Sequence, residues 1–240
     1  MTPAGQRTVI GRLGSSVGVR AWWWIAVVAV IAAAVIGAAY QTHPAYAITI
    51  GQRVQDDPLV QEFNTAEHQP AAVGGRTYRW TRGESSIAFP GIGRSAATVT
   101  LTMAGGPNPH PDVIVLANNG EVAHLHLTPD FADYPIAIAA PYLTTGNLTL
   151  TIRATPFRAP GDRRELGVLV SRVRIQPSGG FALPPARTAL ALWGAVMCVM
   201  LAFLVVGLRG WEAAAVTLLV VIGFGLLLAR DRLFIALGAG

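Results

Sequence analysis

Hydrophobic and polar positions are distributed unevenly along the chain, and three long apolar runs stand out. Each run continues for at least 17 residues without Asp, Glu, Lys or Arg. Because roughly 17 to 25 apolar residues of helix cross the hydrocarbon of a bilayer, the pattern predicts three transmembrane helices that flank a more polar segment at 41–187. The predicted helices are 21–40, 188–208 and 212–229, with a tail at 1–20 and a tail or the start of a further helix at 230–240.

The polar segment between these helices alternates between apolar and polar residues. The alternation is clearest at 98–103, where Val99, Leu101 and Met103 share one face and three threonines share the other. A period of two is typical of a β-strand that buries one face. Nine such stretches at intervals of roughly ten residues predict an all-β sandwich or barrel. The predicted strands are 60–67, 77–81, 85–89, 98–103, 112–117, 122–128, 132–139, 147–153 and 166–175.

Two local patterns predict details of this sheet structure. Asn118, Asn119 and Gly120 separate two apolar runs, and such residues accept the positive φ angles of tight hairpin turns. In the last strand, strict alternation would place Val168 and Val170 on one face but Val173 and Ile175 on the other. We therefore predict a β-bulge at 171–172, which would return all four side chains to the core.

The charges beside the first apolar run predict its orientation. Arg7, Arg12 and Arg20 precede the run, and an excess of Arg favours the cytoplasmic side. The prediction is an integral protein of the cytoplasmic membrane with a cytoplasmic N-terminus and an extracytoplasmic segment 41–187. A cleaved signal peptide is the alternative, because 45–47 matches a small-x-small cleavage site. The apolar core at 22–40 is longer than a signal peptide usually has, which favours the uncleaved anchor.

The net charge of +5 does not indicate a nucleic-acid partner. All 18 basic residues are Arg, and the segment 41–187 holds 12 of them beside 11 acidic residues. Nucleic-acid binders cluster their basic residues on one face, whereas these are distributed along the chain. The single cysteine, Cys198, excludes an intramolecular disulfide, and its place in an apolar run favours a packing role.

His124 and His126 are the first candidate ligand-binding residues. They lie two positions apart on a predicted strand, so both point to one face. Metal binding requires three or four ligands with supporting groups, and only His110 is near in the sequence. A solvated outer face is the alternative, and it is favoured because the alternating residues Ala123, Leu125 and Leu127 would form the core face.

Carboxylates and aromatic residues supply the other candidates. Asp56 and Asp57 follow the first helix, where paired carboxylates would bind a metal or act as a general base, and Glu67 is a similar candidate. Their alternative is a solvated turn. Tyr78 and Trp80 share one strand face and would stack on a sugar, although large aromatic residues at this spacing more often belong to a core.

No motif in the sequence specifies a reaction. A nucleophile elbow, a phosphate-binding glycine loop, a zinc-protease helix and paired C-x-x-C motifs are all missing from it. The sequence therefore predicts no catalytic residue, no metal site and no cofactor.

The chain carries several short motifs, which are Phe63 with Glu67, 78–81, 89–93, 156–157 and 160–168. Together they resemble a family of bacterial multi-pass membrane proteins. In that family a first helix is followed by an extracytoplasmic galactose-binding-like β-sandwich of jelly-roll type and then by many more helices. The resemblance implies a mannosyltransferase-like glycosyltransferase that uses a lipid-phosphate sugar, and Asp56 or Asp57 would match its external catalytic carboxylate. This chain departs from the family in having only three predicted helices.

Two functional hypotheses follow from the sequence. The first is a membrane-anchored β-sandwich that binds a glycan, a lipid-linked sugar or an envelope partner as the accessory region of a glycosyltransferase-like protein. Its candidate ligand-binding residues are Asp57, Glu67, Trp80, His124 and His126. The second is a non-enzymatic assembly protein whose helices bind other membrane subunits, because Gly194, Ala195, Gly223 and Gly225 would allow helices to approach closely.

Overall fold

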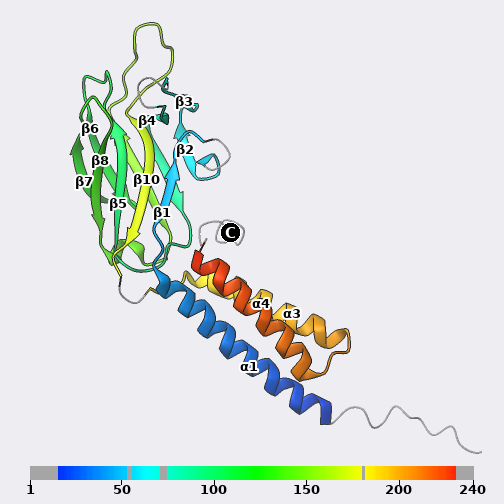
Figure 1. Ribbon diagram of the computed structural model, residues 1–240. Helices are drawn as coiled ribbons and strands as arrows, with labels where there is room; N and C mark the ends of the chain where they lie inside the picture. The colour runs from blue at the N-terminus through cyan, green and yellow to red at the C-terminus, as the bar shows by residue number, and fades with distance from the viewer. Residues whose placement is uncertain (1–15, 53–55, 71–74, 180–181, 231–240) are drawn as a thin grey trace, which may run out of the picture.

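The protein consists of a β domain and three long helices that extend from one end of it (Figure 1). The computed structural model describes residues 16–52, 56–70, 75–179 and 182–230. Within these residues the β domain contains ten strands, all paired antiparallel. The predicted all-β sandwich with three apolar helices is therefore confirmed.

The strands form two layers of a sandwich. One sheet contains, in order, β1 (Tyr46–Thr49), β10 (Leu169–Pro177), β5 (Ala97–Ala104) and β8 (Ala132–Ile138). The other contains β2 (Val60–Phe63), β4 (Thr77–Phe89), β9 (Leu148–Ala154), β6 (Asp112–Ala117) and β7 (Gly120–His126). The short β3 (Glu67–His68) pairs with the start of β4.

Strand β4 joins the two layers. Its first half pairs with β10 at Trp80, and its second half pairs with β9 from Glu84 to Phe89. The sequence predicted two strands here, separated near Gly83. The chain instead stays extended through Gly83, so one strand of 13 residues belongs to both sheets.

The core lies between the two sheets and consists of the alternating apolar residues. Val99, Leu101 and Met103 of β5 are fully buried. The β-bulge in β10 is confirmed, because the register with β5 shifts between Val170 and Arg172. Ser171 is the extra residue, so the valines on both sides of it face the core.

The hairpin between β6 and β7 is also confirmed. Ala117 pairs with Gly120 across a two-residue turn of Asn118 and Asn119. Both asparagines have positive φ, 47° and 70°, as a type I′ turn requires. The positive φ angles therefore fall on the two asparagines, while Gly120 begins β7.

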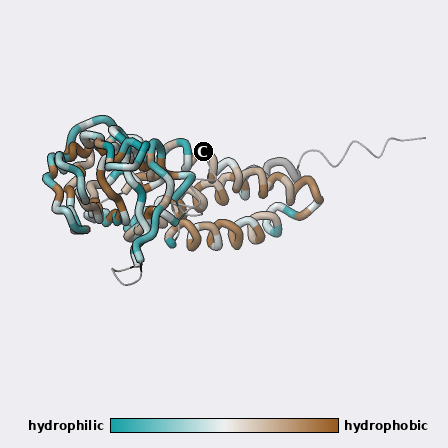
Figure 2. The backbone as a smooth tube through the Cα atoms, turned by 90° about the horizontal axis from the view of Figure 1, so that it is seen from above, coloured by the Kyte–Doolittle hydropathy of each residue, from teal (hydrophilic) through white to brown (hydrophobic). Residues whose placement is uncertain are grey.

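Three helices form the second part of the molecule. They are α1 (Ser16–Ala39), α3 (Ala186–Val205) and α4 (Gly210–Arg230), and each is long and apolar enough to cross a membrane. Figure 2 shows their largely hydrophobic colour beside the mixed colours of the β domain. Exposed Trp22, Trp23 and Trp211 lie at the helix ends away from the β domain, where interfacial anchors are expected.

Tyr40 lies at the joint between the helices and the β domain. It belongs to the short helix η2 (Tyr40–Thr42) and is fully buried in a cluster with Ala182, Leu192 and Leu228. The ring therefore helps to join the helices to the β domain.

Polar contacts fix the joint between the helices and the β domain. The Gln41 side chain donates to the carbonyl of Ala182 (2.9 Å) and accepts from its N–H (3.2 Å). The Arg94 N–H donates to the carbonyl of Leu183 at 3.1 Å. Only three residues separate η2 from β1. The base of the sandwich is therefore held close to the helix ends.

Candidate functional site

The predicted carboxylate pair Asp56 and Asp57 is occupied by Arg79. Asp56 is fully buried, and its carboxylate accepts two hydrogen bonds from the Arg79 guanidinium (2.7 and 3.2 Å) and one from the Gly51 N–H (2.6 Å). Asp57 also binds Arg79 but stays largely exposed. Burial lowers the pKa of Arg79, but its bonds to the two carboxylates outweigh this and raise it. The solvated-turn alternative is thus wrong for Asp56, which ties its loop to β4.

Glu67 belongs to a network at the end of the sandwich farthest from the helices. Its carboxylate accepts from Arg164 (2.6 Å) and from the Tyr78 hydroxyl (3.1 Å), and Arg164 also binds Asp162 (2.7 Å). Burial, with the negative Glu67 beside it, raises the pKa of Tyr78. The side-chain hydrogen bonds from Arg164 lower the pKa of Asp162 to about 2. We call Glu67, Tyr78, Asp162 and Arg164 the distal network.

Trp80 lies in a small aromatic core near this network. It is 7% exposed and packs with Leu166 and Leu169. Phe157 meets its ring edge to face, with ring centroids 6.0 Å apart. These contacts cover the indole and give Trp80 a packing role.

His124 and His126 lie on the outer face of β7 with one carboxylate each. His124 Nε2 is 2.7 Å from Glu121, and His126 Nδ1 is 2.8 Å from Asp112. Both histidines are exposed. Within the described residues, no three His, Cys, Asp or Glu side chains come together to hold a metal.

A groove that sequence reasoning missed lies at the opposite end of the sandwich, where the helices attach. It has a volume of about 560 Å³, within the usual range for small-molecule sites. We call it the proximal groove. Its lining residues are Asn118, Asn119, Gly120, Pro141, Tyr142, Thr144, Thr145 and Thr149.

The strand register explains why these residues meet. Ala117 at the end of β6 pairs with Leu150 near the start of β9, so the β6–β7 turn lies beside Thr149. Strand β8 ends at the same edge and leads into the short helix η4 (Ala140–Leu143), which supplies Pro141 and Tyr142. Gly146, next to Thr145, approaches Pro185 so closely that a Cβ there would lie 2.9 Å from the proline ring. The groove thus opens close to the start of α3.

Asn118 forms the rigid floor of the proximal groove. Its amide donates to the carbonyls of Tyr142 (2.6 Å) and Asn147 (2.9 Å), and its side-chain oxygen accepts from the Thr149 N–H (2.9 Å). These bonds hold the turn, η4 and β9 together. Asn118 is therefore committed to structure and is not free to bind a ligand.

Gly120 allows the Tyr142 ring to lie directly against the turn. A Cβ at residue 120 would overlap that ring. The Tyr142 hydroxyl donates weakly to the carbonyl of Glu121 at 3.3 Å. The phenol is half-buried, so it presents a fixed apolar surface along one wall of the groove.

Several polar groups of the proximal groove remain available. Asn119, Thr144 and Thr149 are exposed, and none of their side chains forms a hydrogen bond within the described residues. Each offers a donor and an acceptor. An aromatic wall beside a few convergent hydroxyl and amide groups is the composition expected of a site for a small polar ligand.

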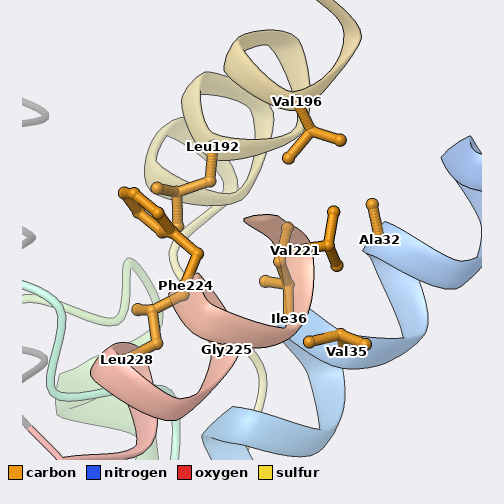
Figure 3. Close-up of a pocket in the computed structure, with 9 residues that line it drawn as sticks. All are labelled: Ala32, Val35, Ile36, Leu192, Val196, Val221, Phe224, Gly225 and Leu228. Carbon is orange, nitrogen blue, oxygen red and sulfur yellow. The ribbon is translucent and has the colours of Figure 1, made fainter. Parts of the chain in front are cut away.

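A second cavity lies among the helices but has no room for a ligand. Figure 3 shows its apolar lining from α1, α3 and α4, including Val35, Leu192 and Phe224. Its volume is about 20 Å³, close to the minimum for one water molecule. Gly225 belongs to this contact, since a Cβ there would overlap Val35. Gly194 and Gly223 have no such neighbour within 4 Å.

Comparisons with known proteins find similarity only among solved structures. No protein-family model and no curated protein matches the chain, so the resemblance to membrane glycosyltransferases stays a prediction. A family 35 carbohydrate-binding module from Clostridium thermocellum is 12% identical, with a TM-score of 0.36, over 54% of this chain and 97% of that one.

Two further structures are similar to the same extent. The CBM36-1 domain of a multidomain xylanase from the hindgut metagenome of Trinervitermes trinervoides is 12% identical, with a TM-score of 0.35, over 57% of this chain and 100% of that one. The Podospora anserina GH26-CBM35 β-(1,4)-mannanase is 14% identical, with a TM-score of 0.34, over 57% of this chain and 28% of that one. Similarity this low carries no argument about the ligand, which must come from the proximal groove itself.

Proposed function

We propose that this chain is a membrane-anchored β-sandwich module that binds a glycan in the proximal groove. The observation that carries the proposal is the Tyr142 ring fixed beside Asn119, Thr144 and Thr149, whose side chains form no hydrogen bond in the part of the chain that the structure describes. Sugars combine apolar C–H faces with many hydroxyl groups. An aromatic surface beside hydroxyl and amide groups complements both.

The groove is a better ligand site than the residues that the sequence singled out. Glu67 pairs with Arg164, and Asp57 pairs with Arg79. His124 and His126 each lie beside a carboxylate. Trp80 is covered by Phe157 and Leu166. A ligand at any of these positions would have to displace an existing contact, whereas a ligand in the proximal groove displaces only water.

The joint with the helices supports a position of the groove near the membrane surface. Gly146 lies against Pro185, one residue before α3. The proposed glycan is therefore one that reaches the bilayer surface, either as part of the envelope or as a lipid-linked sugar. The module would serve as the accessory region of a glycosyltransferase-like protein, on the extracytoplasmic side that Arg7, Arg12 and Arg20 predict.

Binding of soluble oligosaccharides to the full chain in lipid nanodiscs tests the proposal. We expect saturation-transfer NMR to detect binding, and we expect Tyr142→Ala to abolish it because the substitution removes the aromatic wall. Gln176→Ala is the matched control, since this exposed residue lies at the same end of the other sheet. Absence of binding by every neutral and acidic oligosaccharide of an envelope panel would refute the proposal.

The side of the membrane requires a separate test. The protein has one cysteine, Cys198, so Cys198→Ser provides a background for new labelling sites. We expect a membrane-impermeant thiol reagent to label Thr155→Cys, at an exposed position of the β domain, in intact cells. Labelling only after the cells are broken would place the domain in the cytoplasm.

Open glycine surfaces on the helices support a second candidate, an assembly protein that binds other membrane subunits. Gly194 and Gly223 leave space at the surfaces of α3 and α4, where another helix would approach closely. Mild detergent extraction distinguishes the candidates. A stable complex that Gly223→Leu disrupts would favour assembly, and a monomer that binds oligosaccharide would favour the glycan-binding module.

A further inference from the structure

We infer that the proximal groove selects uncharged saccharides and excludes acidic ones. The inference rests on the proposed glycan binding and specifies the class of glycan. It comes from the chemistry of the groove lining and from the distribution of charge around it.

The lining, as far as the described residues form it, offers only uncharged partners near neutral pH. Its eight residues are asparagine, threonine, tyrosine, proline and glycine. Hydroxyl and amide groups pair readily with the hydroxyls of a neutral sugar. The carboxylate of a uronic acid would instead lose water without gaining a cationic partner, which costs free energy.

The chain around the groove is acidic. Residues 95–152 include the whole lining and contain no Lys or Arg, but they contain Asp112, Glu121, Asp130 and Asp133. In the rest of the segment 41–187, 12 Arg accompany seven acidic residues. Glu121 adjoins the lining residue Gly120, whereas Asp112, Asp130 and Asp133 lie at the ends of β6 and β8 away from the groove. The acidic residue close to the groove is therefore Glu121, whose charge opposes an anionic ligand.

The basic residues that border this stretch do not line the groove. Arg153 is held by Glu84 at 2.9 Å. Arg94 is half-buried, and its backbone binds Leu183. The charged residue that adjoins the groove in the sequence is Glu121, whose carbonyl accepts from Tyr142. The charged residue next to the lining along the chain is therefore an acid, and its carboxylate lies 2.7 Å from His124.

Matched pairs of neutral and acidic sugars test the selectivity. The probes are methyl glucoside with methyl glucuronide, and methyl galactoside with methyl galacturonide, added to the full chain in nanodiscs of neutral lipid. We expect the neutral member of each pair to bind roughly tenfold more tightly at low salt. Because salt screens exposed charges, the part of this preference that comes from the field should shrink as the ionic strength rises.

A positive charge added to the groove should increase binding of acidic sugars, which makes the test specific to this site. Thr144 is exposed and its side chain has no hydrogen-bond partner in the described residues. Thr144→Arg should raise the affinity for both uronides several-fold, while Gln176→Arg on the other sheet should change neither. Arg94→Gln should leave the preference unchanged.

The outcomes separate this inference from the proposed function. Equal or tighter binding of the uronides, or a preference that Arg94→Gln alters, would overturn the inference and leave glycan binding in place. Binding of neutral sugars that Tyr142→Ala does not affect would place the site elsewhere and overturn the inference as well. Failure of every sugar to bind would overturn both.

Discussion

The two ends of the β domain use their polar side chains in opposite ways. At the end far from the helices, Arg164 joins Glu67 and Asp162, and Arg79 joins Asp56 and Asp57. At the end near the helices, the polar groups of the proximal groove are uncharged, and several have no side-chain hydrogen bond within the described residues. Charged residues are the first candidates for function in a sequence, yet here they mainly hold the fold together.

The difference has a physical reason. A buried charge is costly unless a partner compensates it, so the folded chain surrounds Asp56 with Arg79 and the Gly51 N–H. An exposed hydroxyl or amide carries a much smaller penalty, because water satisfies it. Uncharged groups can therefore stay open for a ligand at little cost to stability.

The largest expected effect comes from removing the cation at the charged end. Arg79→Met leaves Asp56 buried without a compensating charge and should destabilise the β domain by about 3 to 5 kcal/mol. Urea unfolding of the full chain in detergent, followed by hydrogen exchange in β4, measures the loss.

The exposed pair of Arg153 with Glu84 supplies the control for this experiment. Both side chains are about half exposed, and such pairs contribute less than about 1 kcal/mol. Arg153→Met should therefore have little effect. If the two variants lose the same stability, burial does not make the Arg79 pair stronger than the exposed pair of Arg153 with Glu84.

The next effect tests how rigidly the uncharged end is built. Gly120→Ala places a methyl group where the Tyr142 ring lies, and overpacking of this kind costs about 1 to 3 kcal/mol. We expect lower stability and weaker saccharide binding together, because the ring must move. Nitrogen-edited NMR and calorimetry would follow the two changes.

Gly83→Ala is the matched control for Gly120→Ala. Both glycines lie in strands, and Pro156, 3.7 Å or more from the added methyl, is the only neighbour found within 4 Å of it in the described chain. This variant should leave stability and binding nearly unchanged. If it weakens binding as much as Gly120→Ala does, the contact with Tyr142 is not what shapes the groove.

Two isosteric substitutions compare a structural hydroxyl with an open one. Thr81 is fully buried and accepts a hydrogen bond from the Val168 N–H at 2.8 Å, so Thr81→Val should cost about 1 to 3 kcal/mol. Thr149→Val removes an exposed hydroxyl of the groove and should change stability by less than about 0.5 kcal/mol. Saccharide binding should show the reverse order, with the larger loss in Thr149→Val. A stability cost at Thr149 comparable to that at Thr81 would mean that its hydroxyl is not free.

The sequence predicted the parts of the fold that depend on local patterns. Alternation located most strands, and the change of phase between Val170 and Val173 located the bulge in β10. It did not predict that β4 crosses between two sheets, because Gly83 resembles a turn residue and only the partner strands keep it extended.

The proximal groove was beyond sequence reasoning for a related reason. Asn118 and Thr149 are 31 positions apart, and they meet because β6 pairs with β9. The alternation of apolar and polar residues within β6 or β9 does not indicate which strand will pair with it. The burial of Asp56 was missed in the same way, since it depends on Arg79, 23 positions away. The useful signal in the sequence was the turn of two asparagines, because the side chain of the first, Asn118, holds the turn against β9.

The smallest expected effect is that of low pH, which should affect the distal network but not the proximal groove. Asp162 has its pKa lowered to about 2, chiefly by side-chain hydrogen bonds from Arg164. Because this folded value lies below the value of roughly 3.9 for an unperturbed Asp, the carboxylate contributes stability above that pH and loses it as the pH falls through about 2. The carboxyl carbon shift of Asp162 should therefore titrate near pH 2, and Arg164→Gln should move the midpoint upward. Among the described residues, none that lines the groove is a carboxylate, so binding of a neutral sugar should be the same at pH 7 and at pH 5 while the domain stays folded. If Asp162 of the unsubstituted protein titrates near the ordinary pKa of an aspartate, the hydrogen bonds from Arg164 do not persist in solution.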